Sequence, residues 1–155
     1  MDYEFVPMKI KEARIIDEWK YKGVVKEIYM DPYFESFEEG DIVLTGPGGC
    51  EGFAIYHNNE IIGLFEYYTP DNILEIGLAL NPEYVGKKLG LEFLLAGLEF
   101  GIKNYNYNKE FIKLNVDKKN IPAVSLYKKA GFEIYNKNEE TFDMKIDTKD
   151  IPIKE

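Results

Sequence analysis

Residues 120–132 carry the most information in this chain. They read Asn120-Ile121-Pro122-Ala123-Val124-Ser125-Leu126-Tyr127-Lys128-Lys129-Ala130-Gly131-Phe132. The stretch predicts a short helix that begins after Asn120, a typical N-cap, with Pro122 in the first turn and Gly131 as the stop. Tyr127 falls on the apolar face of that helix beside two alanines, as a core tyrosine would.

A second informative stretch lies upstream of this helix. It reads Leu78-Ala79-Leu80-Asn81-Pro82-Glu83-Tyr84-Val85-Gly86-Lys87-Lys88-Leu89-Gly90. The pattern predicts the end of a strand, a glycine-containing turn and a helix over about residues 87–103. The free N–H groups of a first helical turn attract a phosphate or pyrophosphate, and two lysines add charge. The alternative is a plain strand–helix connection with exposed lysines.

The glycine turn fits neither common nucleotide motif. No Gly-Lys-Ser/Thr follows it, and it lacks the three glycines of a dinucleotide fingerprint after an N-terminal strand. If the turn binds a pyrophosphate, its ligand is therefore another molecule that contains this group, and coenzyme A is such a molecule.

Together the two stretches are similar to the GNAT acyltransferase superfamily. The late helix of that family reads Asn-x-x-Ala-x-x-Leu-Tyr-x-x-x-Gly-Phe, and every fixed position is matched: Asn120, Ala123, Leu126, Tyr127, Gly131 and Phe132. The earlier stretch resembles the family's coenzyme-binding turn, Arg/Gln-x-x-Gly-x-Gly/Ala. Val85 stands where the family usually has Arg or Gln, and Lys88 stands where it usually has the middle Gly.

The resemblance implies a direct transfer of an acyl group from acyl-coenzyme A to an amine. It makes Tyr127 the general acid for the departing thiolate, since a phenol with a pKa near 10 stays protonated until needed. It makes Asn120 a partner of the pantetheine arm, in addition to its helix cap. The expected coenzyme contacts also include the backbone of Leu78, Ala79 and Leu80 and the turn residues Val85, Gly86, Lys87, Lys88, Leu89, Gly90 and Leu91.

The general base is expected among the carboxylates of two predicted strands. Glu75 lies on the small-residue face of its strand with Gly77 and Ala79, and some members of the family keep a glutamate there. Glu66, on the preceding strand, is the second candidate. The later strand, where other members place a glutamate, has Asn115, which cannot act as a base. Alternatives are an exposed surface role for Glu75 and proton transfer through water alone.

The remaining pattern predicts an order of β-α-α-β-β-β-α-β-α-β-β. A helix is expected over about residues 9–21 with Gly23 as its stop, and another from Asp31 and Pro32 onwards. Residues 40–52 form a long glycine-rich loop, and Asn58-Asn59 a hairpin turn. The expected fold class is α/β, one GNAT-like domain over residues 1–155, with a mixed and mostly antiparallel sheet of about six or seven strands flanked by about four helices.

An aromatic cluster accompanies the second expected helix. Its members are Tyr29, Tyr33, Phe34 and Phe37. By the resemblance they fall in the segment that walls the acceptor pocket, and the alternative is a packing surface between two short helices.

Composition limits the other possibilities. The 155 residues carry a net charge of −9, with 45% apolar and 30% charged residues, typical of a globular protein and unfavourable for nucleic-acid binding. Neither a secretory signal nor the roughly 20-residue apolar span of a membrane helix is apparent. With a single histidine, His57, and a single cysteine, Cys50, no metal site of several His or Cys ligands is expected, and a reducing cytoplasmic location fits.

The sequence therefore predicts an N-acetyltransferase that uses acetyl-CoA as co-substrate without a metal. Its acceptor is a primary amine of an unidentified small molecule or peptide, and a homodimer is possible. Two alternatives are a catalytically silent acyl-CoA sensor and a structural or partner-binding domain.

Overall fold

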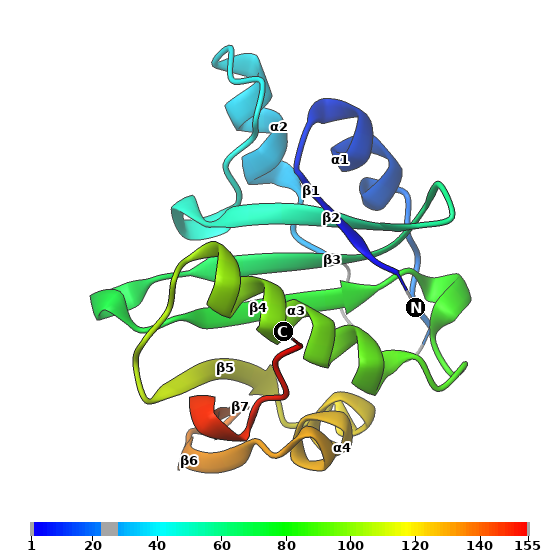
Figure 1. The fold of residues 1–155 in the computed structure, drawn as a ribbon. Coiled ribbons are helices and arrows are strands. Elements are labelled where there is room, and N and C mark those ends of the chain that lie inside the picture. Colours follow the sequence, from blue (N-terminus) through cyan, green and yellow to red (C-terminus); the bar gives the residue numbers. More distant parts are fainter. Residues whose placement is uncertain (1, 23–27, 155) are drawn as a thin grey trace. The chain divides into compact units, whose positions relative to one another are not determined.

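The computed structural model describes residues 2–22 and 28–154. They form seven strands and four α-helices in the predicted order (Figure 1). The elements are β1 (Glu4–Pro7), α1 (Ile10–Asp17), α2 (Asp31–Glu38), β2 (Glu51–His57), β3 (Glu60–Tyr68), β4 (Glu75–Leu80), α3 (Gly90–Asn104), β5 (Phe111–Asp117), α4 (Ile121–Ala130), β6 (Glu133–Lys137) and β7 (Thr141–Asp147).

The strands hydrogen-bond in the order β1-β2-β3-β4-β5-β7-β6. Strands β4 and β5 are parallel, as expected for strands joined through a crossover helix, with Glu75 opposite Lys113. The pairs β1–β2, β2–β3, β5–β7 and β6–β7 are antiparallel. The expected α/β class with a mixed, mostly antiparallel sheet is confirmed.

The chain divides into two compact units, and the first comprises Met1–Tyr68 and Leu78–Gly86. Its hairpin between β2 and β3 turns at Asn58 and Asn59, whose φ angles of 51° and 64° fit the predicted turn. Helices α1 and α2 lie side by side (Figure 1). A buried cluster joins them to the strands: Met8, Ala13, Ile16, Met30, Tyr33, Leu44, Ala54, Ile61 and Leu64.

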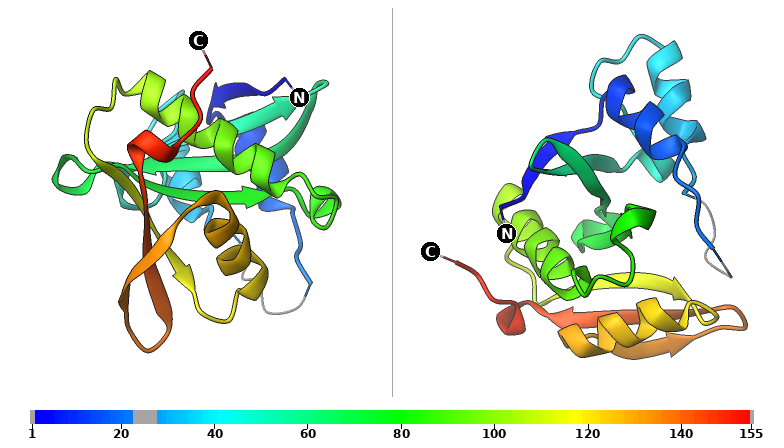
Figure 2. Two further views of the ribbon diagram at one scale, coloured as in Figure 1. Left: turned by 60° about the horizontal axis from the view of Figure 1, so that its bottom comes forward. Right: turned by 90° about the vertical axis from the view of Figure 1, so that its right-hand side faces the viewer.

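The second unit comprises Thr69–Gly77 and Lys87–Glu155. Helix α4 lies along the hairpin of β6 and β7 (Figure 2). Its C-terminal Gly131 has a φ of 115°, the left-handed conformation that ends a helix, and an added Cβ would lie 3.4 Å from Ile146. The predicted N-cap and stop of this helix are both confirmed.

Two predicted helices differ from the observed ones. Helix α1 ends at Asp17, several residues before the expected end, and the expected stop at Gly23 lies outside the described residues. Helix α3 begins at Gly90 and not at Lys87, because Lys88 has a left-handed backbone with a φ of 62° that no helix accommodates.

The helical spacing of apolar residues in α3 predicts a buried stripe of Leu91, Leu94, Leu95, Leu98 and Ile102. The buried face of α3 differs from this stripe. The observed buried residues are Phe93, Leu94, Gly97, Leu98 and Gly101. Leucine spacing alone did not reveal this face, because two of its buried residues are glycines.

In the described part of the chain, no helix has both the length and the apolar character that crossing a membrane requires.

Candidate functional site

The turn between β4 and α3 is anchored by Asn81. This buried side chain accepts a hydrogen bond from the Glu83 N–H at 3.0 Å and donates one to the Ile61 carbonyl at 3.0 Å. The Asn81 N–H also donates to the Ile62 carbonyl at 2.8 Å. The start of the turn is thereby tied to strand β3, while residues 85–88 further along are exposed.

Residues 85–88 form this exposed turn, and two of them have left-handed backbones. Gly86 has a φ of 84°, and Lys88 has a φ of 62°. Gly86 adopts this conformation without steric cost, whereas a side chain such as that of Lys88 costs about 1–2 kcal/mol there. The two lysines are exposed and precede the first turn of α3, so their charge lies beside its free N–H groups.

The second unit brings the two sequence motifs into contact. A Cβ added to Gly90, the first residue of α3, would lie 3.2 Å from Cδ2 of Leu126 on α4. Gly90 therefore permits a close approach of the two helices, which explains a small residue at this motif position.

Asn120 caps helix α4. Its side-chain oxygen accepts a hydrogen bond from the Ala123 N–H at 3.3 Å, which leaves its amide group as the donor suited to a carbonyl of an incoming ligand.

Tyr127 lies on the buried face of α4, 8% exposed, with its ring 5.8 Å from that of Phe132. Burial raises the pKa of its phenol to about 12. The group therefore stays protonated through the physiological range, as a proton donor must.

Strand β4 supplies the backbone that the sequence assigns to the pantetheine arm. Leu78, Ala79 and Leu80 are all half-buried. The hydroxyl of Tyr21 donates a hydrogen bond to the Leu80 carbonyl, a contact that sequence reasoning missed. A carbonyl oxygen has a second lone pair, so the strand keeps an acceptor at this position.

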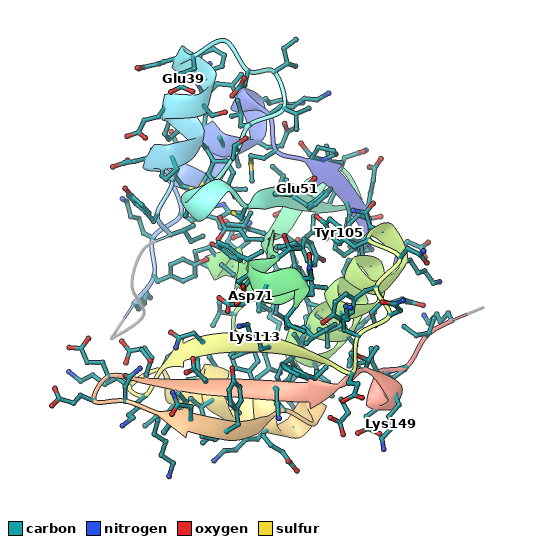
Figure 3. The ribbon with its side chains drawn as sticks, turned by 90° about the vertical axis from the view of Figure 1, so that its left-hand side faces the viewer. Glu39, Glu51, Asp71, Tyr105, Lys113 and Lys149 are labelled. Atoms are coloured by element: carbon teal, nitrogen blue, oxygen red, sulfur yellow. The ribbon has the colours of Figure 1, made fainter. Side chains whose placement is uncertain are left out.

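Glu75 begins β4 and pairs with a lysine on the parallel strand. Its Oε1 lies 3.9 Å from Nζ of Lys113, which Figure 3 labels on β5, and their side chains are 32% and 25% exposed. Asn115, two residues further along β5, donates to Asp143 at 2.8 Å and to Thr141 at 2.9 Å. Sequence analysis did not foresee the lysine partner of Glu75, because no local pattern joins these positions.

Glu66 lies in the first unit with two tyrosines around its carboxylate. The Tyr33 hydroxyl donates to Oε2 at 2.6 Å, and the Tyr68 hydroxyl donates to Oε1 at 3.3 Å. Burial raises the pKa of the Glu66 carboxyl, although both hydrogen bonds act in the opposite direction. Burial also raises the pKa of the Cys50 thiol beside them to about 11, so this group stays uncharged.

A slot between two glycines holds the ring of Tyr33. A Cβ on Gly46 would lie 2.5 Å from the Tyr33 hydroxyl, and one on Gly52 would lie 2.1 Å from it. Gly46 lies in the loop between α2 and β2, whose two ends are marked by Glu39 and Glu51 in Figure 3, and Gly52 is the second residue of β2. Gly52 is directly opposite Glu66 in the β2–β3 pair, so its missing side chain gives the phenol access to the carboxylate.

The predicted aromatic cluster does not form one surface. Tyr33 is fully buried and Phe34 packs against the core, whereas Tyr29 is 62% and Phe37 is 41% exposed. Arg14 lies 5.7 Å above the Phe37 ring. Of these four residues, Tyr33 is the one whose side chain, in the described part of the chain, hydrogen-bonds to a candidate base, Glu66.

Among residues 2–22 and 28–154, no three histidine, cysteine, aspartate or glutamate side chains are grouped so as to hold a metal ion. The exposed turn with its two lysines and left-handed backbone, together with the Asn120 amide, fits a phosphate-bearing, amide-bearing ligand such as coenzyme A.

Comparison with known proteins identifies relatives over most of the chain. The model of the Acetyltransferase (GNAT) family matches residues 15–132. The spermidine N(1)-acetyltransferase of Escherichia coli (strain K12) is 23% identical over 134 residues, which cover 83% of this chain and 71% of that protein.

Solved structures share the fold. A spermidine N-acetyltransferase from Vibrio cholerae, in complex with CoA and spermine, has a TM-score of 0.70 and 17% identity, covering 96% of this chain and 97% of its own. The N-acetyltransferase PseH of Campylobacter jejuni, in complex with acetyl coenzyme A, has a TM-score of 0.70 and 15% identity, covering 94% and 99%. Since the family model spans most of its length, this chain belongs to the acetyltransferase (GNAT) family and is an acetyl-CoA-dependent N-acetyltransferase.

Proposed function

We propose that the enzyme acetylates a primary amine of a small cationic acceptor, with a polyamine as the first class to test. Two related spermidine N-acetyltransferases support this choice. The net charge of −9 also supports it, because an acidic protein attracts cations.

The coenzyme is held, in this proposal, by residues of β4, the turn, α3 and α4. The turn from Val85 to Leu91 takes the phosphates, and the backbone of Leu78–Leu80 pairs with the pantetheine amides. The Asn120 amide donates to the same arm. The observations that support these roles are the exposed turn with two lysines and the N-cap geometry of Asn120.

Acetyl-CoA supplies the activated acetyl thioester. Glu75 accepts the proton that the attacking amine loses, directly or through water, so that the nitrogen can form the new C–N bond. Tyr127 gives its phenolic proton to the sulfur as the C–S bond breaks. The single observation that carries this assignment is the burial of Tyr127 on the helix whose sequence matches the family, and burial raises the pKa of its phenol.

Glu66 is the alternative base, since a carboxyl whose pKa is raised by burial is suited to accept a proton near neutral pH.

The test of the proposed function is the release of free coenzyme A across an amine panel, followed over pH for wild type, Glu75→Gln and Glu66→Gln. If Glu75 is the base, Glu75→Gln loses most rate near neutral pH and least at high pH, where the amine deprotonates unaided. An unchanged profile for Glu75→Gln with a shifted profile for Glu66→Gln would assign the base to Glu66.

Three further points belong to the proposal. Residues 1–155 act as one catalytic domain, supported by a family match that includes segments of both units. The single cysteine supports a reducing, cytoplasmic location. A homodimer is proposed from the family resemblance alone, and light scattering after gel filtration tests it.

A further inference from the structure

We propose that Lys113 is a positioning residue for the reaction. Its ammonium group holds the carboxylate of Glu75 in the direction in which that carboxylate takes up the proton lost by the attacking amine. The inference rests on the proposed acetyl transfer with Glu75 as its base. Glu75, Lys113 and Tyr127 all belong to the second compact unit.

Lys113 attracts one oxygen of the Glu75 carboxylate and leaves the other open. Its Nζ lies 3.9 Å from Oε1, which is too long for a hydrogen bond and short enough for Coulomb attraction. In the part of the chain that the structure describes, the carboxylate has no other ion-pair or hydrogen-bond partner. The charge of Lys113 therefore orients the carboxylate while its lone pairs remain available for a proton.

The backbones that carry these two side chains are fixed to one another. Glu75 and Lys113 are directly opposite in the parallel pair of β4 and β5, and the Lys113 N–H donates to the Leu74 carbonyl at 3.0 Å. The Tyr107 hydroxyl accepts from the Leu74 N–H at 3.2 Å and donates to the Phe111 carbonyl at 2.5 Å. Tyr107 thus joins the chain just before Glu75 to the start of β5. The ion pair is therefore set before a ligand arrives, as positioning requires.

The neighbouring lysine leaves Lys113 free to face the carboxylate. Lys145 is directly opposite Lys113 in the β5–β7 pair, a position where like charges repel each other. The Nζ of Lys145 lies 4.9 Å from the centre of the Phe111 ring and 5.3 Å from that of the Tyr135 ring. The two aromatic faces thus hold the charge of Lys145, so that Lys113 is the cation that pairs with Glu75.

A second carboxylate near Lys113 already has its own donors. Asp143 accepts hydrogen bonds from the side-chain amides of Asn115 at 2.8 Å and Asn136 at 3.0 Å. These hydrogen bonds, with a smaller effect from the charge of Lys113, lower the pKa of Asp143. Asp143 is therefore ionised and hydrogen-bonded at neutral pH without a direct ion pair to Lys113.

The test measures kcat from coenzyme A release, with the fastest acceptor of the amine panel and spermidine tried first. We expect kcat of Lys113→Met to fall by roughly three- to tenfold, because a partly exposed ion pair contributes modestly. Lys113→Arg keeps the charge and should restore kcat to within about twofold of wild type. The control, Lys137→Met, removes the same charge from an exposed position on β6 and should behave like wild type.

Two further measurements separate positioning from structural support. The double variant Glu75→Gln/Lys113→Met should have the kcat of Glu75→Gln alone, because Lys113 acts through a carboxylate that is no longer present. The loss in Lys113→Met should also be largest near neutral pH and smallest at high pH, where the amine deprotonates unaided. A lysine with only a structural role would lower kcat by the same factor in both backgrounds and at every pH.

An unchanged kcat in Lys113→Met, no recovery in Lys113→Arg or a further fall in the double variant would each overturn the inference. So would an unchanged pH profile in Glu75→Gln, which leaves acetyl transfer intact and places the base elsewhere. If melting temperatures show that Lys113→Met does not fold, Lys113→Gln replaces it with the same expectations. Failure of the proposed function has a different signature: wild type then releases no coenzyme A with any amine, and the positioning role is refuted with it.

Discussion

Tyr127 is the residue on which the proposed acetyl transfer most depends. Replacing it by phenylalanine keeps the ring against Phe132 and removes only the hydroxyl. We expect kcat to fall by roughly 10²–10⁴, the range for loss of a general acid, with a much smaller change in acetyl-CoA affinity. Steady-state kinetics and titration calorimetry measure the two quantities.

Tyr105→Phe is the control, because this half-buried tyrosine follows the last residue of α3 and lies on neither α4 nor β4. A full rate in Tyr127→Phe would return Tyr127 to the role of a core residue. The pKa of about 12 adds a further expectation for wild type, namely that the rate does not fall from loss of the Tyr127 proton below about pH 11.

Glu66 makes the stability of the fold dependent on pH. Its carboxyl has a higher pKa in the folded protein than the ordinary value of 4.5, because burial disfavours the charge. Between these two pKa values the folded state binds more protons than the unfolded state, so the free energy of unfolding falls as pH rises. At neutral pH the folded protein therefore bears the cost of a buried charge.

Glu66→Gln should remove that cost. We expect the melting temperature of the variant to exceed that of wild type at pH 7–8, and the difference to shrink as pH falls towards 4.5. Among the residues that the structure describes, Tyr33, Tyr68 and Cys50 interact with Glu66, and all three are uncharged at neutral pH, so none of them reverses the sign. A difference that grows towards low pH would contradict a raised pKa of the Glu66 carboxyl.

At the scale of elements, the turn before α3 contains a local conflict between residue and backbone. Lys88 has a φ of 62°, which glycine adopts freely and lysine does not. Lys88→Gly should raise the free energy of unfolding by roughly 0.5–1 kcal/mol, the left-handed strain less the added flexibility of the unfolded chain. Denaturant titration measures it.

Lys87→Gly is the control for Lys88→Gly, since Lys87 is equally exposed and has no left-handed backbone. It should lower stability or leave it unchanged. In Lys88→Gly the coenzyme affinity separates two further effects: tighter binding means that the side chain crowds the turn, and weaker binding means that its ammonium contacts a phosphate. A loss of stability in Lys88→Gly would show that Lys88 makes contacts that outweigh its backbone strain.

At the scale of the whole molecule, the net charge of −9 should influence how the acceptor binds. Attraction between an acidic protein and a cation weakens as salt screens it. We therefore expect KM for 1,3-diaminopropane to rise more steeply between 0.05 and 0.5 M NaCl, on the order of severalfold, than KM for n-propylamine. Parallel slopes for the two amines would mean that a second charge is not recognised.

Several features of the fold followed from the sequence because local chemistry dictates them. Pro122 restricts its own backbone, whereas Gly131 and the Asn58-Asn59 pair tolerate the left-handed conformations of a helix end and a tight turn, and all three features were found as predicted. The order of strands and helices followed from hydrophobic periodicity together with these signals. The end of α1 and the start of α3 did not, and α3 starts late because Lys88 has a left-handed backbone that local sequence does not predict for a lysine.

The sequence by itself determined the family, the element order and the candidate roles of Tyr127 and Asn120, since these lie within one continuous motif. Only the tertiary structure decided that Lys113 faces Glu75 across two parallel strands, and that Tyr33 on α2 reaches Glu66 on β3 through the space left by Gly46 and Gly52. These pairs are separated by about 30 residues or more along the chain, so no local periodicity links them. Strand register and burial bring them together, and burial is also what raises the pKa of Glu66.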